Sequence, residues 1–216
     1  MKTKKHIKLF SIMMILVLIT STFLVSAAGD NYTYYMDKKL QGSSGLANRT
    51  YYIDKTAIDA GYEDEAINAI KSWVTATKNN KASVSKVGFK RVYSKTNATI
   101  VIYGKAKSTF PSSVKGALGY VVYYSGSNSI SLPGGMPSIN WSQCAVYVDN
   151  KLSSSKAQRT ICHEIGHGLG LLHPMHPAST GSSIMLPDDT VYPKYKSDKP
   201  TSADAFMLDT RYRVLK

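Results

Sequence analysis

HEIGHGLGLLH, residues 163–173, contains three of the five histidines of this 216-residue chain, together with one carboxylate. Residues four apart on a helix lie on the same face, so the imidazoles of His163 and His167 can bind one metal ion together. Gly170 can adopt the left-handed conformation that ends a helix, and the turn then brings His173 back as a third ligand. The stretch therefore predicts a helix whose C-terminal end forms a metal site.

Three histidine ligands indicate a catalytic rather than a structural metal site. Neutral imidazoles suit zinc, and three of them leave one position of its tetrahedral shell open for water, whose pKa zinc lowers to about 7. Glu164 follows His163 directly and can accept the proton of that water, then return it to a leaving amine. We therefore expect one catalytic Zn²⁺ held by His163, His167 and His173, with Glu164 as general base and general acid.

The chain is basic, with 27 Lys and Arg against 14 Asp and Glu and a formal charge of +13. Residues 66–148 contain no acidic residue and ten Lys or Arg. Such a surface favours an anionic cell surface or an acidic substrate, and the alternative is a solvated surface that charge keeps soluble. No RNA-binding or helix-turn-helix signature accompanies the basic residues, so we expect no specific nucleic-acid partner.

Residues 1–28 have the features of a cleaved signal peptide. Four lysines precede an apolar run of 17 residues at positions 9–25, and Ser26, Ala27 and Ala28 follow as small residues at a cleavage site. An uncleaved anchor is the alternative, because the run is near the lower length limit of a bilayer span. No other segment is comparably apolar, so we expect a secreted, extracellular protein without membrane contact after cleavage. Removal of the leader takes away four lysines and leaves a charge of +9.

Hydrophobic periodicity predicts an α+β domain in residues 50–216, after a polar segment at 29–49. Runs rich in β-branched and aromatic residues predict five strands, at 50–53, 87–93, 98–103, 118–124 and 144–148. Helical spacing of apolar residues predicts helices at 62–77, 155–168 and 202–213. Ser155 and Gln158 form a capping-box pattern for the second helix. In the third helix, Ala203, Phe206, Met207 and Val214 are expected on the apolar face.

Cys144 and Cys162 are the two cysteines of the chain, too few for a disulfide scaffold or a four-cysteine zinc site. An oxidising extracellular environment favours a disulfide between them, which would brace the helix that contains His163. Two buried thiols are the alternative.

The sequence resembles the metzincin clan of zinc endopeptidases. His163, Glu164, His167, Gly170 and His173 match the clan's extended zinc signature. The stretch SSIM, residues 182–185, is similar to the clan's tight turn that places a methionine, here Met185, beneath the metal. The resemblance covers roughly residues 50–213.

This resemblance implies a fold and a substrate-binding edge. The implied fold is a metzincin-like zincin catalytic domain, with a five-stranded mixed twisted sheet, two helices above the cleft and an irregular lower lobe that ends in a C-terminal helix. The implied edge strand, which pairs with an extended substrate, consists of Leu118, Gly119, Tyr120, Val121 and Val122.

Within the clan we expect a small, bacterial-type matrixin-like enzyme. Pro174 follows the third histidine, where astacins have glutamate, and Pro187 replaces the zinc-binding tyrosine of astacins and serralysins. In matrixins one segment forms the wall of the primed-side specificity pocket, and Tyr192, Pro193 and Tyr195 resemble that segment. A second, structural zinc is not expected because His176 is the one spare histidine of the mature chain. Whether calcium binds stays open. The acid-free interval argues against it, because that interval lacks the carboxylates that calcium prefers.

Residues 29–49 are interpreted either as a flexible N-terminal segment or as a short pro-peptide. No cysteine lies between the leader and Cys144, which excludes the cysteine latch that matrixins use. In a pro-peptide, Asp30 or Asp37 could bind the zinc, as an aspartate switch does in astacins.

The sequence therefore predicts a secreted zinc-dependent endopeptidase, a metallo-hydrolase that acts as a monomer on extracellular protein or peptide. The alternative is a non-catalytic, zinc-stabilised binding or adhesion module that uses its basic surface. Hydrolysis of a non-protein amide is a third hypothesis. Glu164 favours the enzyme, because a degenerate scaffold needs no general base.

Overall fold

The structure, a computed structural model, describes residues 34–42, 45–80, 85–132, 135–174, 182–187 and 196–213. The chain divides into two units, Met1–Asn31 and Tyr32–Lys216, and every described residue belongs to the second. The expected signal peptide, His176 and the expected pocket wall of Tyr192, Pro193 and Tyr195 lie outside the described residues. In the part of the chain that is described, no helix is long and apolar enough to cross a membrane.

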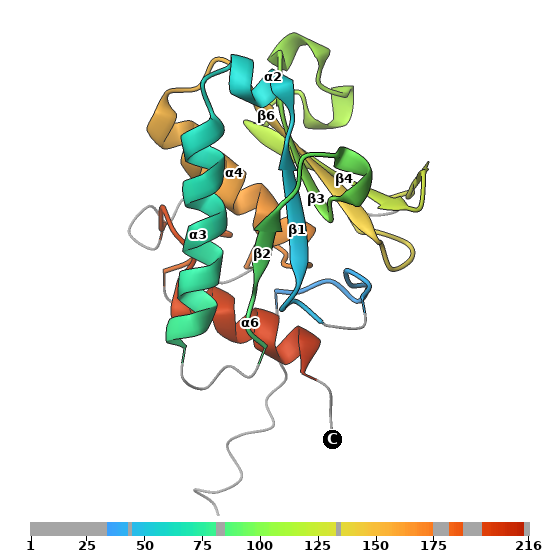
Figure 1. The fold of residues 1–216 in the computed structure, drawn as a ribbon, viewed down its shortest axis with the longest axis vertical. Coiled ribbons are helices and arrows are strands. Elements are labelled where there is room, and N and C mark those ends of the chain that lie inside the picture. Colours follow the sequence, from blue (N-terminus) through green and yellow to red (C-terminus); the bar gives the residue numbers. More distant parts are fainter. Residues whose placement is uncertain are drawn as a thin grey trace, which may run out of the picture. The chain divides into compact units, whose positions relative to one another are not determined.

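Six strands form one mixed sheet (Figure 1). Its order is β2-β1-β3-β6-β4-β5, in which β2, β1, β3 and β6 run parallel and β4 is antiparallel to both β6 and β5. The α+β class with a mixed sheet is confirmed. The bounds are β1 (Arg49–Ile53), β2 (Phe89–Arg91), β3 (Ile100–Lys105), β4 (Gly119–Ser125), β5 (Asn128–Ser129) and β6 (Gln143–Asp149).

The expected sheet had five strands, and the sixth, β5, is a correction to that expectation. β5 pairs with the end of β4, where Ser125 lies opposite Asn128. Gly126, in the two-residue loop between them, adopts a φ of 61°, a conformation that favours glycine in tight hairpins. A strand of two residues is too short to show the alternation from which strands are predicted.

The three expected helices form as α3 (Glu63–Asn79), α4 (Ser154–Gly168) and α6 (Ser202–Tyr212). A further helix, α2 (Lys55–Asp59), was not expected, and the carboxylate of Asp54 caps it by accepting from the backbone N of Thr56 at 3.0 Å. The N-cap of α4 is Ser153 rather than Ser155, so the expected capping box is wrong. Short 3₁₀ turns within the described residues include η1 (Lys95–Asn97), η2 (Lys107–Thr109) and η3 (Ser112–Val114).

The helix α4 packs against β6, β4 and β3 on one side and against α3 on another. Trp73 of α3 is fully buried, and its Nε1 donates to the carbonyl of Cys162 at 2.9 Å. On the sheet side, a Cβ added at Gly168 would lie only 2.6 Å from Sγ of Cys144. Burial on these sides holds α4 rigidly, as a helix that bears a reactive site requires.

The expected disulfide between Cys144 and Cys162 is wrong, because both cysteines are free and buried. Sγ of Cys162 lies 3.9 Å from the carbonyl O of Ala69 in α3, whereas Cys144 lies beneath Gly168. Positions 162 and 168 are about 120° apart around the helix axis. The thiol of Cys162 therefore projects from one face of α4 towards α3, whereas Cys144 packs against a different face of α4.

Residues 34–42, part of the segment interpreted as flexible or as a pro-peptide, pack into the core of the second unit. Tyr34, Met36 and Leu40 expose only 1%, 3% and 1% of their surface. Leu46, a few residues later, is also buried in the same core. This part of the segment is therefore no free tail.

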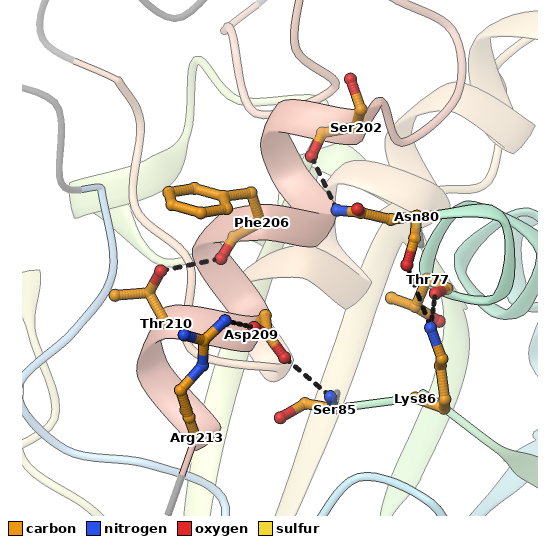
Figure 2. Close-up of polar contacts among 9 residues, drawn as sticks. All are labelled: Thr77, Asn80, Ser85, Lys86, Ser202, Phe206, Asp209, Thr210 and Arg213. Atoms are coloured by element: carbon orange, nitrogen blue, oxygen red, sulfur yellow. Dashed lines mark hydrogen bonds and ion pairs between the residues drawn. The ribbon is translucent and has the colours of Figure 1, made fainter. Parts of the chain in front are cut away.

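Polar contacts attach α6 to the end of α3 and to the segment before β2 (Figure 2). Asp209 is buried and accepts from the backbone N of Ser85 at 2.7 Å, and it also pairs with Arg213. Asn80, just after α3, donates from Nδ2 to the carbonyl of Ser202 at 3.5 Å. These hydrogen bonds thus join α6 to segments that lie far from it in the sequence.

The expected apolar face of α6 is wrong at Phe206, which is 47% exposed. Met207 is buried as expected, and Leu208 is buried as well, together with the carboxylates of Asp204 and Asp209. Apolar periodicity does not predict the inward face of such a helix, because its buried aspartates count as polar positions.

The burial of the two cysteines predicts their reactivity. Burial raises the pKa of Cys144 to about 12 and raises the pKa of Cys162 as well, so neither thiol forms the reactive thiolate at neutral pH. Titration with an aromatic disulfide reagent is expected to detect almost no thiol in the folded protein and two per chain after denaturation without reductant. Detection of no free thiol after denaturation would indicate that Cys144 and Cys162 form the disulfide.

The contacts of Asp209 predict a loss of stability on substitution. In Asp209→Ala the backbone N of Ser85 and the guanidinium of Arg213 lose this acceptor, so the free energy of unfolding is expected to fall by about 1–3 kcal/mol. Thr210→Ala is the matched control, because its exposed hydroxyl bonds only within α6, to the carbonyl of Phe206. Urea unfolding should show a change within about 0.5 kcal/mol for the control. Equal losses in both variants would contradict the role assigned to Asp209.

Candidate active site

Gly170 ends α4 with a φ of 99° in a Schellman motif. Its backbone N donates to the carbonyl of His167 at 2.8 Å, and the N of Leu171 donates to the carbonyl of Gly166 at 2.9 Å. A side chain at position 170 would be strained, since only glycine adopts this φ freely. The turn reverses the chain and brings His173 beside the helix.

The ring nitrogens of His163, His167 and His173 converge on one point. Nε2 of His173 lies 3.0 Å from Nε2 of His163 and 3.2 Å from Nε2 of His167. His163 is buried, His167 is half-buried and His173 is exposed. Among the described residues this is the one group of three or more His, Cys, Asp or Glu whose ligand atoms come together.

These three nitrogens fit a zinc ion. Nδ1 of His163 lies 2.8 Å from the carbonyl of Ile184, and Nδ1 of His167 lies 2.8 Å from the carbonyl of Leu171. A carbonyl only accepts, so each Nδ1 bears the proton and each Nε2 presents a lone pair. Tetrahedral zinc with Zn–N bonds of about 2.0–2.1 Å separates its ligand atoms by about 3.3 Å, close to the separations observed here.

Burial keeps the first two imidazoles neutral. It is the main cause that lowers the pKa of His163 well below its usual value and the pKa of His167 to about 4, and the neighbouring histidines lower both further. Burial also raises the pKa of Glu164 to about 8. A divalent cation in the site favours the ionised carboxylate, because an opposite charge nearby lowers its pKa.

Glu164 lies in a cleft of about 800 Å³ that the three histidines also line. Its side chain is 7% exposed. The start of β4 approaches α4 closely there, since a Cβ at Gly119 would lie 2.9 Å from Cγ of Glu164 and 2.8 Å from Cγ2 of Thr160. The carboxylate is therefore held between helix and strand, at the side of the metal ligands.

The expected edge strand also borders this cleft. Leu118, Gly119, Tyr120 and Val121 line it, and Val122 follows them on β4. The backbone N of Asp149 donates to the carbonyl of Leu118, so even-numbered residues of β4 direct their backbone groups towards β6.

Because backbone groups alternate in antiparallel strands, Gly119 and Val121 direct theirs to the opposite edge. There β5 pairs only with Tyr124 and Ser125, and no other described strand lies along this part of β4. The edge is thus open to an extended peptide.

Met185 lies against α4 between the first two ligands. It is fully buried, and a Cβ at Gly166 would come within 2.3 Å of its Sδ. The preceding residue, Ile184, supplies the carbonyl that accepts from His163. The segment around the methionine thus contacts both the backbone of α4 and a metal ligand.

Asp204 is a residue that the sequence analysis missed. Its fully buried carboxylate accepts from Oγ of Ser183 at 2.5 Å and from the backbone N of Ile184 at 3.2 Å, and so holds the segment around Met185. It also accepts from the backbone N and the hydroxyl of Thr201, which forms a capping box for α6. The spacing Thr201-x-x-Asp204 is a capping signal that could have indicated this residue.

Comparison with known proteins gives a distant likeness. No protein-family model matches the sequence. No curated protein matches it either. Among solved structures, the chain is similar to high choriolytic enzyme 1, a hatching enzyme zinc-protease from Oryzias latipes (medaka fish). The identity is 16% and the TM-score 0.43, over 82% of this chain and 94% of that chain. The atoms of the site, and not this likeness, indicate what the chain does.

The converging nitrogens predict that zinc stabilises the fold through His173. Addition of zinc to the metal-stripped protein is expected to raise its unfolding temperature, because a ligand at about 100 times its Kd contributes about 2.7 kcal/mol. His173→Ala should lose most of this shift, whereas His176→Ala, the matched histidine control, should keep it. Calorimetry with metal analysis measures both effects. The same shift in both variants would contradict the ligand set.

Proposed function

We propose that this chain is a zinc-dependent endopeptidase that hydrolyses peptide bonds of extracellular proteins or peptides. The observation that supports it most is the position of Glu164, a buried carboxylate that lines the same cleft as three converging imidazole nitrogens and lies next to the start of an open edge strand. A closed structural zinc site needs neither a neighbouring carboxylate nor a cleft.

The side chains of the site have separate tasks in this reaction. A zinc ion, when bound, supplies activation of water and polarisation of the scissile carbonyl. The carbonyls of Ile184 and Leu171 hold Nδ1–H of His163 and His167, which fixes the orientation of both rings. Glu164 accepts the proton of the attacking water and passes it to the leaving amine nitrogen, so its carboxylate is regenerated.

The open edge of β4 suits an extended substrate. Gly119 and Val121 offer backbone N–H and C=O groups, which pair with a peptide as an added antiparallel strand. Such pairing contacts the peptide backbone and aligns one bond beside the metal ligands. The absence of a Cβ at Gly119 leaves room where strand and helix are closest.

The finer assignment to a secreted, matrixin-like enzyme is supported by the sequence. Residues 1–28 have the pattern of a signal peptide, and Pro174 and Pro187 occupy positions where astacins differ. The acid-free interval at 66–148 supports an anionic substrate or surface as a partner.

A binding module is the second candidate function, and one observation favours it. A second hollow of about 520 Å³ lies between α3 and the residues before α6. Lys71 and Lys199 line it together with amide and hydroxyl side chains, and none of its described lining residues is acidic. A hollow of this chemistry suits an anionic group, as a binding module for an anionic partner requires.

Substitution of Glu164 separates the two functions. In Glu164→Gln the side chain keeps its size but accepts no proton, so cleavage of a peptide library is expected to fall by at least about 100-fold. Metal analysis should still find one zinc per chain. The matched control is Asp64→Asn, which changes an exposed carboxylate on α3 and should leave cleavage unchanged. Absence of cleavage by zinc-loaded, processed wild type would favour the binding module.

A further inference from the structure

Residues 34–41, here called the N-terminal strap, run alongside the turn that leads to His173. The backbone N of Met36 donates to the carbonyl of Gly170 at 2.7 Å, and the N of Leu172 donates to the carbonyl of Tyr34 at 2.6 Å. Between these bonds, Tyr35 and Leu171 form an antiparallel bridge. The strap thus pairs as a short strand with the residues immediately before the third ligand.

The other end of the strap is tied to the last turn of α4. The backbone N of Leu40 donates to the hydroxyl of Tyr212, which in turn donates to the carbonyl of Leu169 at 3.0 Å. The N of Gln41 donates to the carbonyl of Trp141, whose Nε1 donates to the carbonyl of Gly168 at 3.0 Å. Both connections end at carbonyls of the ligand helix that have no partner further along the helix.

The strap also reaches the support of His163. The hydroxyl of Tyr34 donates to Asp204 at 3.1 Å, and Asp204 accepts from the backbone N of Ile184, whose carbonyl accepts from His163. On the cleft side, Met36 is among the lining residues, and its Sδ lies 3.8 Å from the hydroxyl of Tyr123. Tyr123 in turn donates to the carbonyl of His167. The strap therefore contacts residues that support each of the three ligands.

We propose that the N-terminal strap is a positioning element of the zinc centre and belongs to the working enzyme. His173 is exposed and follows an irregular turn, so its imidazole is the ligand least constrained by helix packing. Ligands must be held within about 0.5 Å of their productive positions, and short surface turns meet this condition only where other segments tie them down. Pairing with the strap restrains the turn in this way.

The proposal bears on the maturation of the chain. Residues that are buried against the ligand helix cannot be removed without loss of these bonds, so any activating cut falls before Tyr34. Asp37 is exposed, and its backbone carbonyl accepts from Arg211 on α6. In this arrangement the strap lies beside the turn that leads to His173 and supports that turn.

The test compares two substitutions of one residue. Met36→Pro removes the backbone N–H that donates to Gly170, whereas Met36→Ala removes the same side chain and keeps that N–H. Zinc affinity is measured by competition with a chromophoric chelator, at a temperature where circular dichroism shows each metal-free variant folded. Met36→Pro is expected to bind zinc about 10- to 100-fold more weakly than Met36→Ala, as for other residues that support metal ligands.

A double-mutant cycle separates positioning from general destabilisation. In the His173→Ala background the turn acts only on His167, through the carbonyl of Leu171, so the difference in zinc affinity between Met36→Pro and Met36→Ala should be clearly smaller than in the parent chain. Equal affinity of the two Met36 variants in the parent chain, or the same weakening in both backgrounds, overturns the proposal. If Met36→Pro does not fold, Tyr34→Phe, which removes only the hydroxyl bonded to Asp204, is tested in a cycle with His163→Ala instead, and it should weaken zinc binding only where His163 is present.

The inference rests on the zinc centre of the proposed function but uses no measurement of hydrolysis. A wild type that binds zinc and cleaves no peptide contradicts the endopeptidase and leaves the cycle interpretable. A wild type that cleaves peptides while the cycle shows no coupling contradicts the strap proposal alone.

Discussion

The last turn of α4 needs hydrogen-bond donors that its own helix cannot supply. Carbonyls at a helix end have no partner in the following turn, and burial makes an unmatched carbonyl costly. In this chain the donors come from the sheet, from the loop before β6, from α6 and from the strap. The carbonyls of Gly168, Leu169 and Gly170 accept from Trp141, Tyr212 and Met36, respectively, and the carbonyl of His167 accepts from Tyr123 in addition to the backbone N of Gly170. The helix that bears two ligands is therefore where four distant segments meet, and its orientation depends on all of them.

A second group of contacts surrounds the buried carboxylate of Asp204. It joins the start of α6, the segment around Met185 and the strap through side-chain and backbone donors. Several hydrogen bonds to the charged form offset the cost of burying the carboxylate. Since the carbonyl of Ile184 holds His163, this network extends from the C-terminal helix to a ring nitrogen that faces the metal. The supports of the site thus include residues far from the zinc signature.

Much of the fold and of the ligand set could be predicted, because both depend on local spacing. The five longer strands and the three longer helices have the periodicity that burial of one or both faces imposes. The errors concern residues whose environment is set by other segments. Cys144 and Cys162 were expected to bond, but Cys162 faces α3 from one side of α4 and Cys144 packs against another side of that helix. Phe206 was expected inside, yet Asp204 and Asp209 occupy the buried positions, where polar partners from other elements receive them.

The sequence alone determined the chemistry of the metal ligands. Two histidines four residues apart share a helix face, and Gly170 permits the turn to His173, so both features follow from helix geometry and the conformational freedom of glycine. Only the tertiary structure decided which segments hold these ligands in place. Tyr34 and Asp204 are 170 positions apart, and the pairing of the strap with residues 170–172 involves backbone groups that every residue type possesses. Local pattern cannot specify such partners, because they are selected by the packing of the whole domain.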